Sequence, residues 1–285
     1  MFLARGAHLH AIRERGLEVK SPDGDFHFRA NATDAPNEVG PVDVVLVAVK
    51  GWQLDDAARS MGPLMGERTI VVPLLNGVRA PAVLSGYVGE QNVLGGLCRI
   101  ISFIDAPGRI THAGYEPSVT FGELDHTRTA RAEALLDAFR KANVKADIPS
   151  SIQEAMWKKF VFIASFGGVA AVARSPAGQL RAIPETRDLM RSAMTEIVAV
   201  ANGQGVALTA HDVDAAMTAV DGLPDDGTAS MQRDVMEGKP SELETMSGDV
   251  VRLGSDSGVS TPVHSFIYAS LAPQERAARA AARIT

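Results

Sequence analysis

The chain has 285 residues, of which 46% are hydrophobic and 22% are charged, as in an ordinary soluble globular protein. This length predicts two domains, because single hydrophobic cores stop growing near this size. The net charge of −6 argues against a nucleic-acid-binding surface, which needs clustered Lys and Arg. No apolar run reaches the roughly 18 residues that span a bilayer, and the N-terminus lacks the apolar region of a signal peptide. We therefore expect a cytoplasmic protein without a membrane or nucleic-acid partner.

Cysteine and histidine usage excludes two further kinds of site. The single cysteine, Cys98, excludes an intrachain disulfide framework and any Cys-x-x-Cys metal pair. It lies in the apolar stretch NVLGGLCRI, which favours a buried structural thiol over a catalytic one. The seven histidines show no His-Glu-x-x-His or other metal-ligand spacing, so we expect no metal site.

The first half of the chain alternates strand and helix patterns. Continuous β-branched runs at 43–49 and 69–75 are typical of parallel strands that are covered on both faces. The expected strands are 43–49, 69–75, 92–98, 109–111, 118–123 and 144–148. The expected helices are 6–15, 54–65, 79–88 and 127–143. This alternation predicts an α/β domain with a parallel sheet of the Rossmann type.

The second half of the chain is helical throughout. Ser150-Ser151 followed by Glu154 predicts a helix N-terminus at its start. The expected helices are 151–169, 184–204, 211–220, 228–237, 242–257 and 261–283. The change of pattern near Ser150 separates a cofactor-binding domain, residues 1–149, from an all-α domain, residues 150–285.

Two of the expected strands end in polar residues. Lys50 follows the strand 43–49, and Asn76-Gly77 follows the strand 69–75. Ligands of open α/β sheets bind just beyond the carboxyl ends of such strands. The cation and the amide are therefore well placed to hold a phosphorylated or carbonyl-bearing ligand. The alternatives are a solvated strand terminus for Lys50 and an ordinary turn for Asn76-Gly77.

The start of the chain differs from a complete dinucleotide-binding domain. Such a domain opens with a strand and a Gly-x-Gly-x-x-Gly turn, and the chain contains no such motif. Met1-Phe2-Leu3 instead reads as the end of a second strand, so we expect the domain to lack its N-terminal segment. Arg5 follows that strand, where an arginine suits the 2′-phosphate of NADP. A plain surface charge is the alternative for Arg5.

Six segments, in the same order, resemble the 2-dehydropantoate 2-reductase (ketopantoate reductase) family. The resemblance runs over essentially the whole chain, and its most specific part is the Trp-x-Lys signature at Trp157 and Lys159. The segments are FLARGAHLHAIRERGL, DVVLVAVKGWQ, VVPLLNGV, GRITHAGYEPSVTFGELD, IQEAMWKKFVFIASFGGVAA and SMQRDVMEGKPSELETMSGDVVRLGSDSGVSTP.

The resemblance implies an NADPH-dependent reduction of 2-dehydropantoate to pantoate, a step toward pantothenate and coenzyme A. It implies a Rossmann-type domain, a helical substrate domain and an active site in the cleft between them. By position it also implies the roles of six residues: catalytic Lys159 and Glu242, substrate-binding Ser230 and Asn76, and cofactor-binding Arg5, Lys50 and again Asn76.

The chemistry of the reaction agrees with a lysine in the catalytic position. Hydride transfer to a 2-oxo acid generates an alkoxide that a nearby cation or acid must stabilise or protonate. Lys159 stands near the start of an apolar helix, where it faces either the solvent or a site. Lysines usually extend to water, and the adjacent Lys158 weakens the case for Lys159 from the sequence alone. Glu242 is either a carboxylate of the site or a first-turn acid beside the cap Ser241-x-x-Glu244. Ser230 is either a substrate ligand or a helix N-cap.

Two departures from the family pattern leave alternatives open. Ile163 and Gly167 stand where the described enzymes carry asparagines that contact the substrate, so another small 2-oxo acid is one alternative. A truncated, non-catalytic family member is the other, because the missing first strand exposes sheet edges and removes the phosphate cradle. A small-molecule 2-oxo acid is thus the expected partner, and a homodimer stays open.

Overall fold

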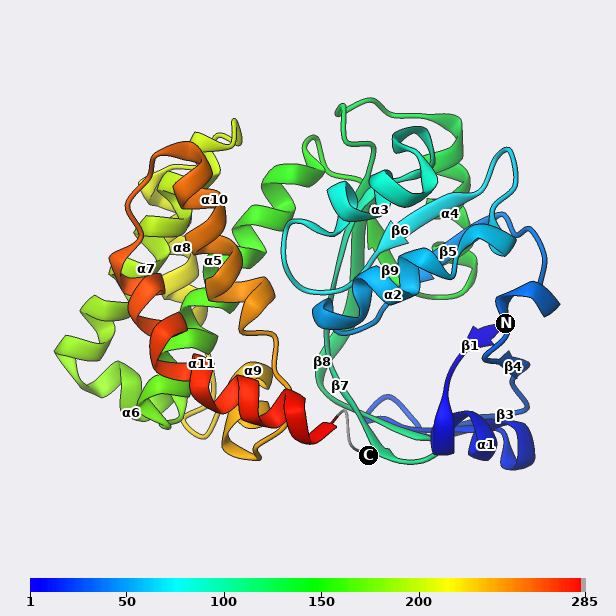
Figure 1. Cartoon of the computed structure of the whole chain (residues 1–285), viewed down its shortest axis with the longest axis horizontal. Coiled ribbons are helices and arrows are strands. Elements are labelled where there is room, and N and C mark those ends of the chain that lie inside the picture. The colour runs from blue at the N-terminus through cyan, green and yellow to red at the C-terminus, as the bar shows by residue number, and fades with distance from the viewer. Residues whose placement is uncertain (283–285) are drawn as a thin grey trace. The chain divides into compact units, whose positions relative to one another are not determined.

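The computed structural model describes residues 1–282, which divide into two compact units (Figure 1). The first unit holds residues 1–49, 53–75 and 81–152. The second holds the chain from Gln153 onward together with two short segments, Lys50–Trp52 and Asn76–Ala80. These two segments follow the strands at 43–49 and 69–75, so the polar strand ends belong to the helical unit.

The first unit contains two short parallel strand pairs. Strand β5 (Val44–Val47) pairs with β6 (Ile70–Pro73), and β1 (Phe2–Leu3) pairs with β4 (Ala32–Thr33). All four residues of β6 are buried, as its β-branched sequence predicts. The expectation that β5 is covered on both faces is wrong, because Leu46 is 46% exposed. Within residues 1–282, β5 pairs along one edge only.

A mixed sheet contains the remaining strands of the first unit. Its strands are, in order, β3 (Phe26–Phe28), β2 (Leu17–Lys20), β8 (Arg109–Gly122) and β7 (Gly95–Ala106), and β9 (Lys145–Asp147) pairs with β8. Strands β7 and β8 form one long antiparallel hairpin (Figure 1). The short strands expected at 109–111 and 118–123 are therefore one strand. The sheet accommodates Gly114, at φ +80°, and a register shift near Arg99 without ending.

Helices of the first unit lie close to their expected positions. They are α1 (Gly6–Arg15), α2 (Leu54–Arg59), α3 (Ala80–Val88, whose first residue belongs to the second unit) and α4 (Ala130–Lys141), with single 3₁₀ turns η1 (Pro36–Glu38), η3 (Gly62–Leu64) and η4 (Glu90–Asn92). A further 3₁₀ turn, η2 (Gly51–Gln53), begins in the second unit. The helix expected at 54–65 ends at Arg59, because Pro63 lacks the donor that would continue it. Phe121 and Leu136 are fully buried in the core between α4 and the sheet.

The second unit is all-α, which confirms the expected fold class of a Rossmann-type α/β domain followed by a helical domain (Figure 1). Its helices are α5 (Ile152–Ala173), α6 (Ala177–Ala182), α7 (Pro184–Gly203), α8 (Ala210–Asp221), α9 (Ser230–Met236), α10 (Asp249–Ser257) and α11 (Pro262–Ala282). A π-helical turn, η5 (Glu244–Gly248), replaces the start of the helix expected at 242–257. Position 283, the expected end of the last helix, lies outside the described residues.

Helix α5 forms the centre of the helical core. Phe160, Val161, Ala164 and Val169 are all at most 1% exposed and pack within one apolar cluster. Over residues 1–282, α5 is the one helix long and apolar enough to cross a bilayer, a run that the sequence pattern did not predict. However, 67% of that window is buried within the protein, as in the core helix of a folded domain.

Candidate active site

Lys159 lies near the start of α5 and points toward the segment Asn76–Ala80. Its side chain is half-buried, and its Nζ donates a hydrogen bond of 2.8 Å to Asn76 Oδ1. The buried Trp157 and Phe160, with ring centroids 5.7 Å apart, fix the rotation of the helix. Lys158 is exposed and pairs instead with Glu154, at 3.3 Å, and Asp212, at 3.5 Å.

Asn76 joins Lys159 to Glu242. Its Nδ2 donates a hydrogen bond of 3.1 Å to Glu242 Oε2. A lysine ammonium can only donate and a carboxylate can only accept, so this pair of neighbours fixes the orientation of the Asn76 amide. Gly77 has φ +100°, a conformation that favours glycine and turns the chain directly after the amide. The Asn-Gly turn thus presents its side chain to two charged groups.

Glu242 is a buried carboxylate, with 4% of its surface exposed. Its Oε1 accepts a hydrogen bond of 3.2 Å from the backbone N of Gly51, and its Oε2 accepts the one from Asn76. A Cβ atom on Gly51 would lie 2.5 Å from Thr245 Oγ1, so a larger residue would push this backbone away from the carboxylate. Within the helical unit, Glu242 therefore binds both strand-end segments through one carboxylate.

Lys50 directly precedes Gly51, the backbone donor to Glu242, but its own side chain pairs with another acid. Its Nζ lies 2.9 Å from Asp234 Oδ2 on α9. The side chain of Lys50 is 41% exposed and that of Asp234 is 20% exposed. The lysine, which follows β5, is thus partly exposed to solvent and forms an ion pair with a carboxylate of α9.

Ser230 is the first residue of α9 rather than its N-cap, which is Ala229. It is half-buried, and no hydrogen bond of its hydroxyl is found within residues 1–282. A Cβ atom on Gly167 would lie 3.6 Å from Ala229 Cβ, so Gly167 of α5 lies next to the start of α9. Lys159, Ile163 and Gly167 are spaced four residues apart, which places them along one side of α5.

Arg5 belongs to the first unit, between β1 and α1. It is the N-cap residue of α1, its side chain is exposed, and it forms no ion pair or hydrogen bond through that side chain within the described chain. The first turn of α1 carries no acidic residue, so the helix N-terminus is free to attract an anion. This arrangement fits a phosphate group.

Some contacts differ from the sequence interpretation or were missed by it. The expected cap Ser241-x-x-Glu244 is wrong: the Ser241 hydroxyl donates to Glu275 Oε2 at 2.5 Å, and Glu244 accepts from Tyr268 at 2.8 Å. The backbone donor Gly51 gives no side-chain signal in a sequence. The contact of Lys50 with Asp234, four residues after Ser230 on the same helix, was not expected.

An ion pair on the segment Asn76–Ala80 was also missed. Arg79 Nη1 lies 3.1 Å from Oδ1 of Asp249, whose side chain is only 4% exposed. Arg252 lies 2.9 Å from the same Asp249 oxygen. A sequence signal for Asp249 exists: it is an acidic residue next to the apolar Val250, which is fully buried. Within residues 1–282, no group of three or more His, Cys, Asp or Glu side chains is arranged to hold a metal ion.

Comparison with known proteins assigns the family. Residues 1–126 match "Ketopantoate reductase PanE/ApbA", and residues 151–275 match "Ketopantoate reductase PanE/ApbA C terminal". The 2-dehydropantoate 2-reductase of Halobacterium salinarum is 30% identical over 257 residues, which cover 90% of this chain and 84% of that protein. The chain belongs to the ketopantoate reductase family.

Solved structures of related proteins agree with this family assignment. The crystal structure of the 2-dehydropantoate 2-reductase from Geobacter metallireducens superposes with a TM-score of 0.88 at 30% identity, over 95% of this chain and 90% of that one. D-mandelate dehydrogenase, in a structure with NADH and anilino(oxo)acetate, shares the fold with a TM-score of 0.89 at 19% identity, over 97% and 90% of the two chains. As a member of the ketopantoate reductase family, the chain is an oxidoreductase of an NAD(P)-dependent type.

Proposed function

We propose that the protein reduces a small 2-oxo acid with NADPH, and that ketopantoate, reduced to pantoate, is its substrate. The observation that carries this proposal is the chain of contacts from Lys159 through Asn76 to Glu242. It joins a half-buried cation, a neutral amide and a buried carboxylate at the ends of two strands. Such a cation can hold a carbonyl oxygen on which negative charge develops.

The residues of this chain fit a phosphorylated dinucleotide. Arg5, exposed beside the N-terminus of α1, suits the 2′-phosphate that distinguishes NADPH from NADH. Lys50, at the end of β5, suits a second phosphate or a ribose hydroxyl on the cofactor. When bound, NADPH would supply the hydride for the carbonyl carbon of the substrate.

The residues of the helical unit would bind the substrate and donate the proton. The Lys159 ammonium would hydrogen-bond the substrate carbonyl oxygen and then give it a proton. Asn76 would hold that ammonium in place, because Glu242 fixes the amide with its oxygen toward Lys159. The Ser230 hydroxyl, which has no protein partner within the described residues, would be available to the substrate.

A specific observation favours a second candidate substrate. Ile163 and Gly167, one and two turns beyond Lys159 on α5, offer no polar side chain, and Gly167 lies against the apolar Ala229 and Met231 at the start of α9. A 2-oxo acid with a larger apolar side chain suits such a wall better than one with a hydroxyl group. The reaction and the role of Lys159 would be the same.

A substrate panel tests the proposed function. The purified protein is mixed with NADPH or NADH and with ketopantoate, a branched aliphatic 2-oxo acid or phenylglyoxylate, and cofactor absorbance is followed. We expect kcat/KM to be highest for ketopantoate with NADPH. A preference for an apolar 2-oxo acid would replace the substrate but keep the reaction. No turnover of any 2-oxo acid above the rate without protein would contradict the proposal.

A further inference from the structure

We propose that Glu275 and Arg279, on the last helix, are positioning residues for the active site and set the place of Glu242. This inference rests on the proposed function, because it assigns these residues to the same reaction. Neither residue is part of the Lys159–Asn76–Glu242 contacts. Both act on the chain segments that carry those contacts.

The first step is a buried carboxylate that holds the residue before Glu242. Glu275 is 3% exposed, and its carboxylate accepts hydrogen bonds from the backbone N of Ser241, at 2.9 and 3.2 Å, and from the Ser241 hydroxyl, at 2.5 Å. Ser241 itself is fully buried. The Ser241 hydroxyl also accepts a bond of 3.2 Å from the backbone N of Leu243. The backbone is thus fixed on both sides of Glu242.

The second step is an arginine that neutralises this carboxylate. Arg279 Nε lies 2.6 Å from Glu275 Oε1, one helical turn away, although its N–H is not aligned with that oxygen. The contact is therefore an ion pair more than a hydrogen bond. A buried carboxylate needs such a partner, because an unpaired buried charge is strongly destabilising.

The third step is that the same guanidinium touches both segments that meet at Glu242. Arg279 Nη2 donates a hydrogen bond of 3.0 Å to the backbone O of Ser241. Its Cζ lies 5.5 Å from the centre of the Trp52 ring, within the range of a cation–π contact. Ser241 precedes Glu242, and Trp52 follows Gly51. Arg279 therefore contacts the residue next to each partner of the hydrogen bond between Gly51 N and Glu242, which belongs to the active site.

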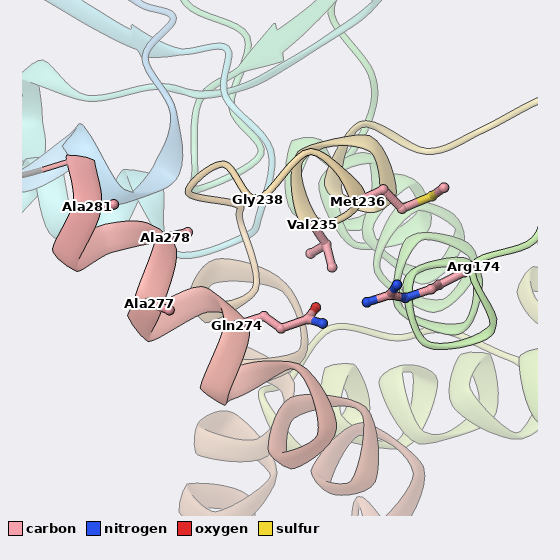
Figure 2. Close-up of a pocket in the computed structure, with 8 residues that line it drawn as sticks. All are labelled: Arg174, Val235, Met236, Gly238, Gln274, Ala277, Ala278 and Ala281. Atoms are coloured by element: carbon pink, nitrogen blue, oxygen red, sulfur yellow. The ribbon is translucent and has the colours of Figure 1, made fainter.

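An adjacent face of α11 supplies a matched control. Gln274, Ala277, Ala278 and Ala281 line a groove with Val235 and Gly238 (Figure 2). In Figure 2 the Gln274 side chain points across this groove toward Arg174. Gln274 is exposed and directly precedes Glu275 along the same helix. A substitution of Gln274 changes α11 without touching Ser241 or Trp52.

The test compares four variants of the full chain by steady-state kinetics and by the ¹⁵N–¹H signal of the Gly51 amide. For Glu275→Gln and Arg279→Ala we expect kcat to fall by roughly 10- to 100-fold, as for a misplaced catalytic group, with little change in KM for NADPH. Arg279→Lys keeps the positive charge but loses the planar guanidinium, so its kcat should lie between those of these variants and wild type. Gln274→Ala should match wild type. The Gly51 amide signal should move in the Glu275 and Arg279 variants and stay in place in Gln274→Ala.

The two readouts separate this inference from the proposed function. Wild-type kcat in a folded Glu275→Gln or Arg279→Ala variant, together with an unmoved Gly51 amide, would overturn it. If Glu275→Gln does not fold, Arg279→Lys at the less buried partner decides the matter. If the wild-type protein turns over no 2-oxo acid, the proposed function fails. The Gly51 signal then still tests whether α11 positions the contact to Glu242.

Discussion

Lys159 and Glu242 are joined by one amide: Asn76 accepts from the lysine at 2.8 Å and donates to the glutamate at 3.1 Å. The ammonium can only donate and the carboxylate can only accept, so the amide has one orientation. The lysine is half-buried and the glutamate is buried, which strengthens hydrogen bonds to both charges. The three residues come from three distant parts of the chain, and we expect them to act as a unit.

Replacing the carboxylate of Glu242 should disturb this unit. Glu242→Gln puts a second NH₂ group where Asn76 and Gly51 both need an acceptor, so one of these donors loses its partner. We expect kcat to fall by about 10-fold or more, since a charge-assisted hydrogen bond is worth about 1.5–3 kcal/mol. Steady-state kinetics with saturating NADPH measure this. Glu237→Gln, at an exposed carboxylate paired with Lys239, is the control, and an equal loss in both variants would count against the role of Glu242.

Arg5 should decide between the two nicotinamide cofactors. Arg5→Ala removes an exposed guanidinium beside the N-terminus of α1, and with it the partner proposed for the 2′-phosphate. We expect KM for NADPH to rise by roughly 10- to 100-fold, the equivalent of one charge-assisted contact, while KM for NADH changes little. Arg15→Ala, at the other end of α1, should leave both values unchanged. Equal effects of Arg5→Ala on both cofactors would show that the arginine does not read the phosphate.

The wall beside Lys159 should control substrate choice. Ile163→Asn places an amide one turn from the lysine, within reach of a hydroxyl on the substrate. We expect kcat/KM to shift toward ketopantoate and away from apolar 2-oxo acids by up to about 10-fold, the equivalent of one neutral hydrogen bond of about 1 kcal/mol. The ratio of kcat/KM values for the two substrates, in the variant and in wild type, is the measurement. An unchanged ratio would place the substrate side chain elsewhere.

His264 makes stability depend on pH. It is fully buried, its ring contacts Ala193 O at 3.1 Å and Ser247 Oγ at 3.3 Å, and burial lowers its pKa from 6.5 to about 4. The unfolded chain therefore binds a proton at this site between pH 6.5 and pH 4 while the folded chain does not. The folded state loses stability as pH falls through this window, by up to roughly 3 kcal/mol.

Urea unfolding at several pH values between 7 and 4 tests this prediction. Burial raises the pKa of Glu196, which acts in the opposite direction, so the comparison needs a variant and not one curve alone. His264→Gln keeps a donor for Ala193 O and removes the titration. Its free energy of unfolding should fall less steeply below pH 6.5 than that of wild type. Parallel curves would show that His264 does not set the slope.

The parts of the fold with strong local patterns could be predicted from the sequence. The buried β6 and the apolar α5 were expected near their observed positions, because β-branched and apolar runs reflect burial directly. Strand β2, with the charged sequence LEVK, and the exposed β3 were missed, because their pairing with β8 and with each other comes from distant parts of the chain. The same holds for the long hairpin of β7 and β8, in which Gly114 does not end the strand.

The site was predictable only in its side chains, and through a resemblance to known enzymes. Lys159, Asn76 and Glu242 were expected by position, but nothing local shows that one amide joins the two charges. Gly51 contributes a backbone N–H, which every residue other than proline has, so the sequence gives no sign of it. Ser241 reads as a helix cap for Glu244, whereas its hydroxyl binds Glu275, 34 residues later. Long-range partners of this kind cannot be read from spacing.

The kcat of Lys159→Ala, compared with that of Lys158→Ala, tests the central claim most directly. The two variants remove the same group from adjacent positions, one joined to Asn76 and the other paired with Glu154 and Asp212. With NADPH and the best 2-oxo acid substrate, we predict that Lys159→Ala loses roughly 10²- to 10⁴-fold in kcat, the usual worth of a positioned acid. We predict that Lys158→Ala keeps the wild-type rate. A folded Lys159→Ala variant with the kcat of Lys158→Ala would contradict the account.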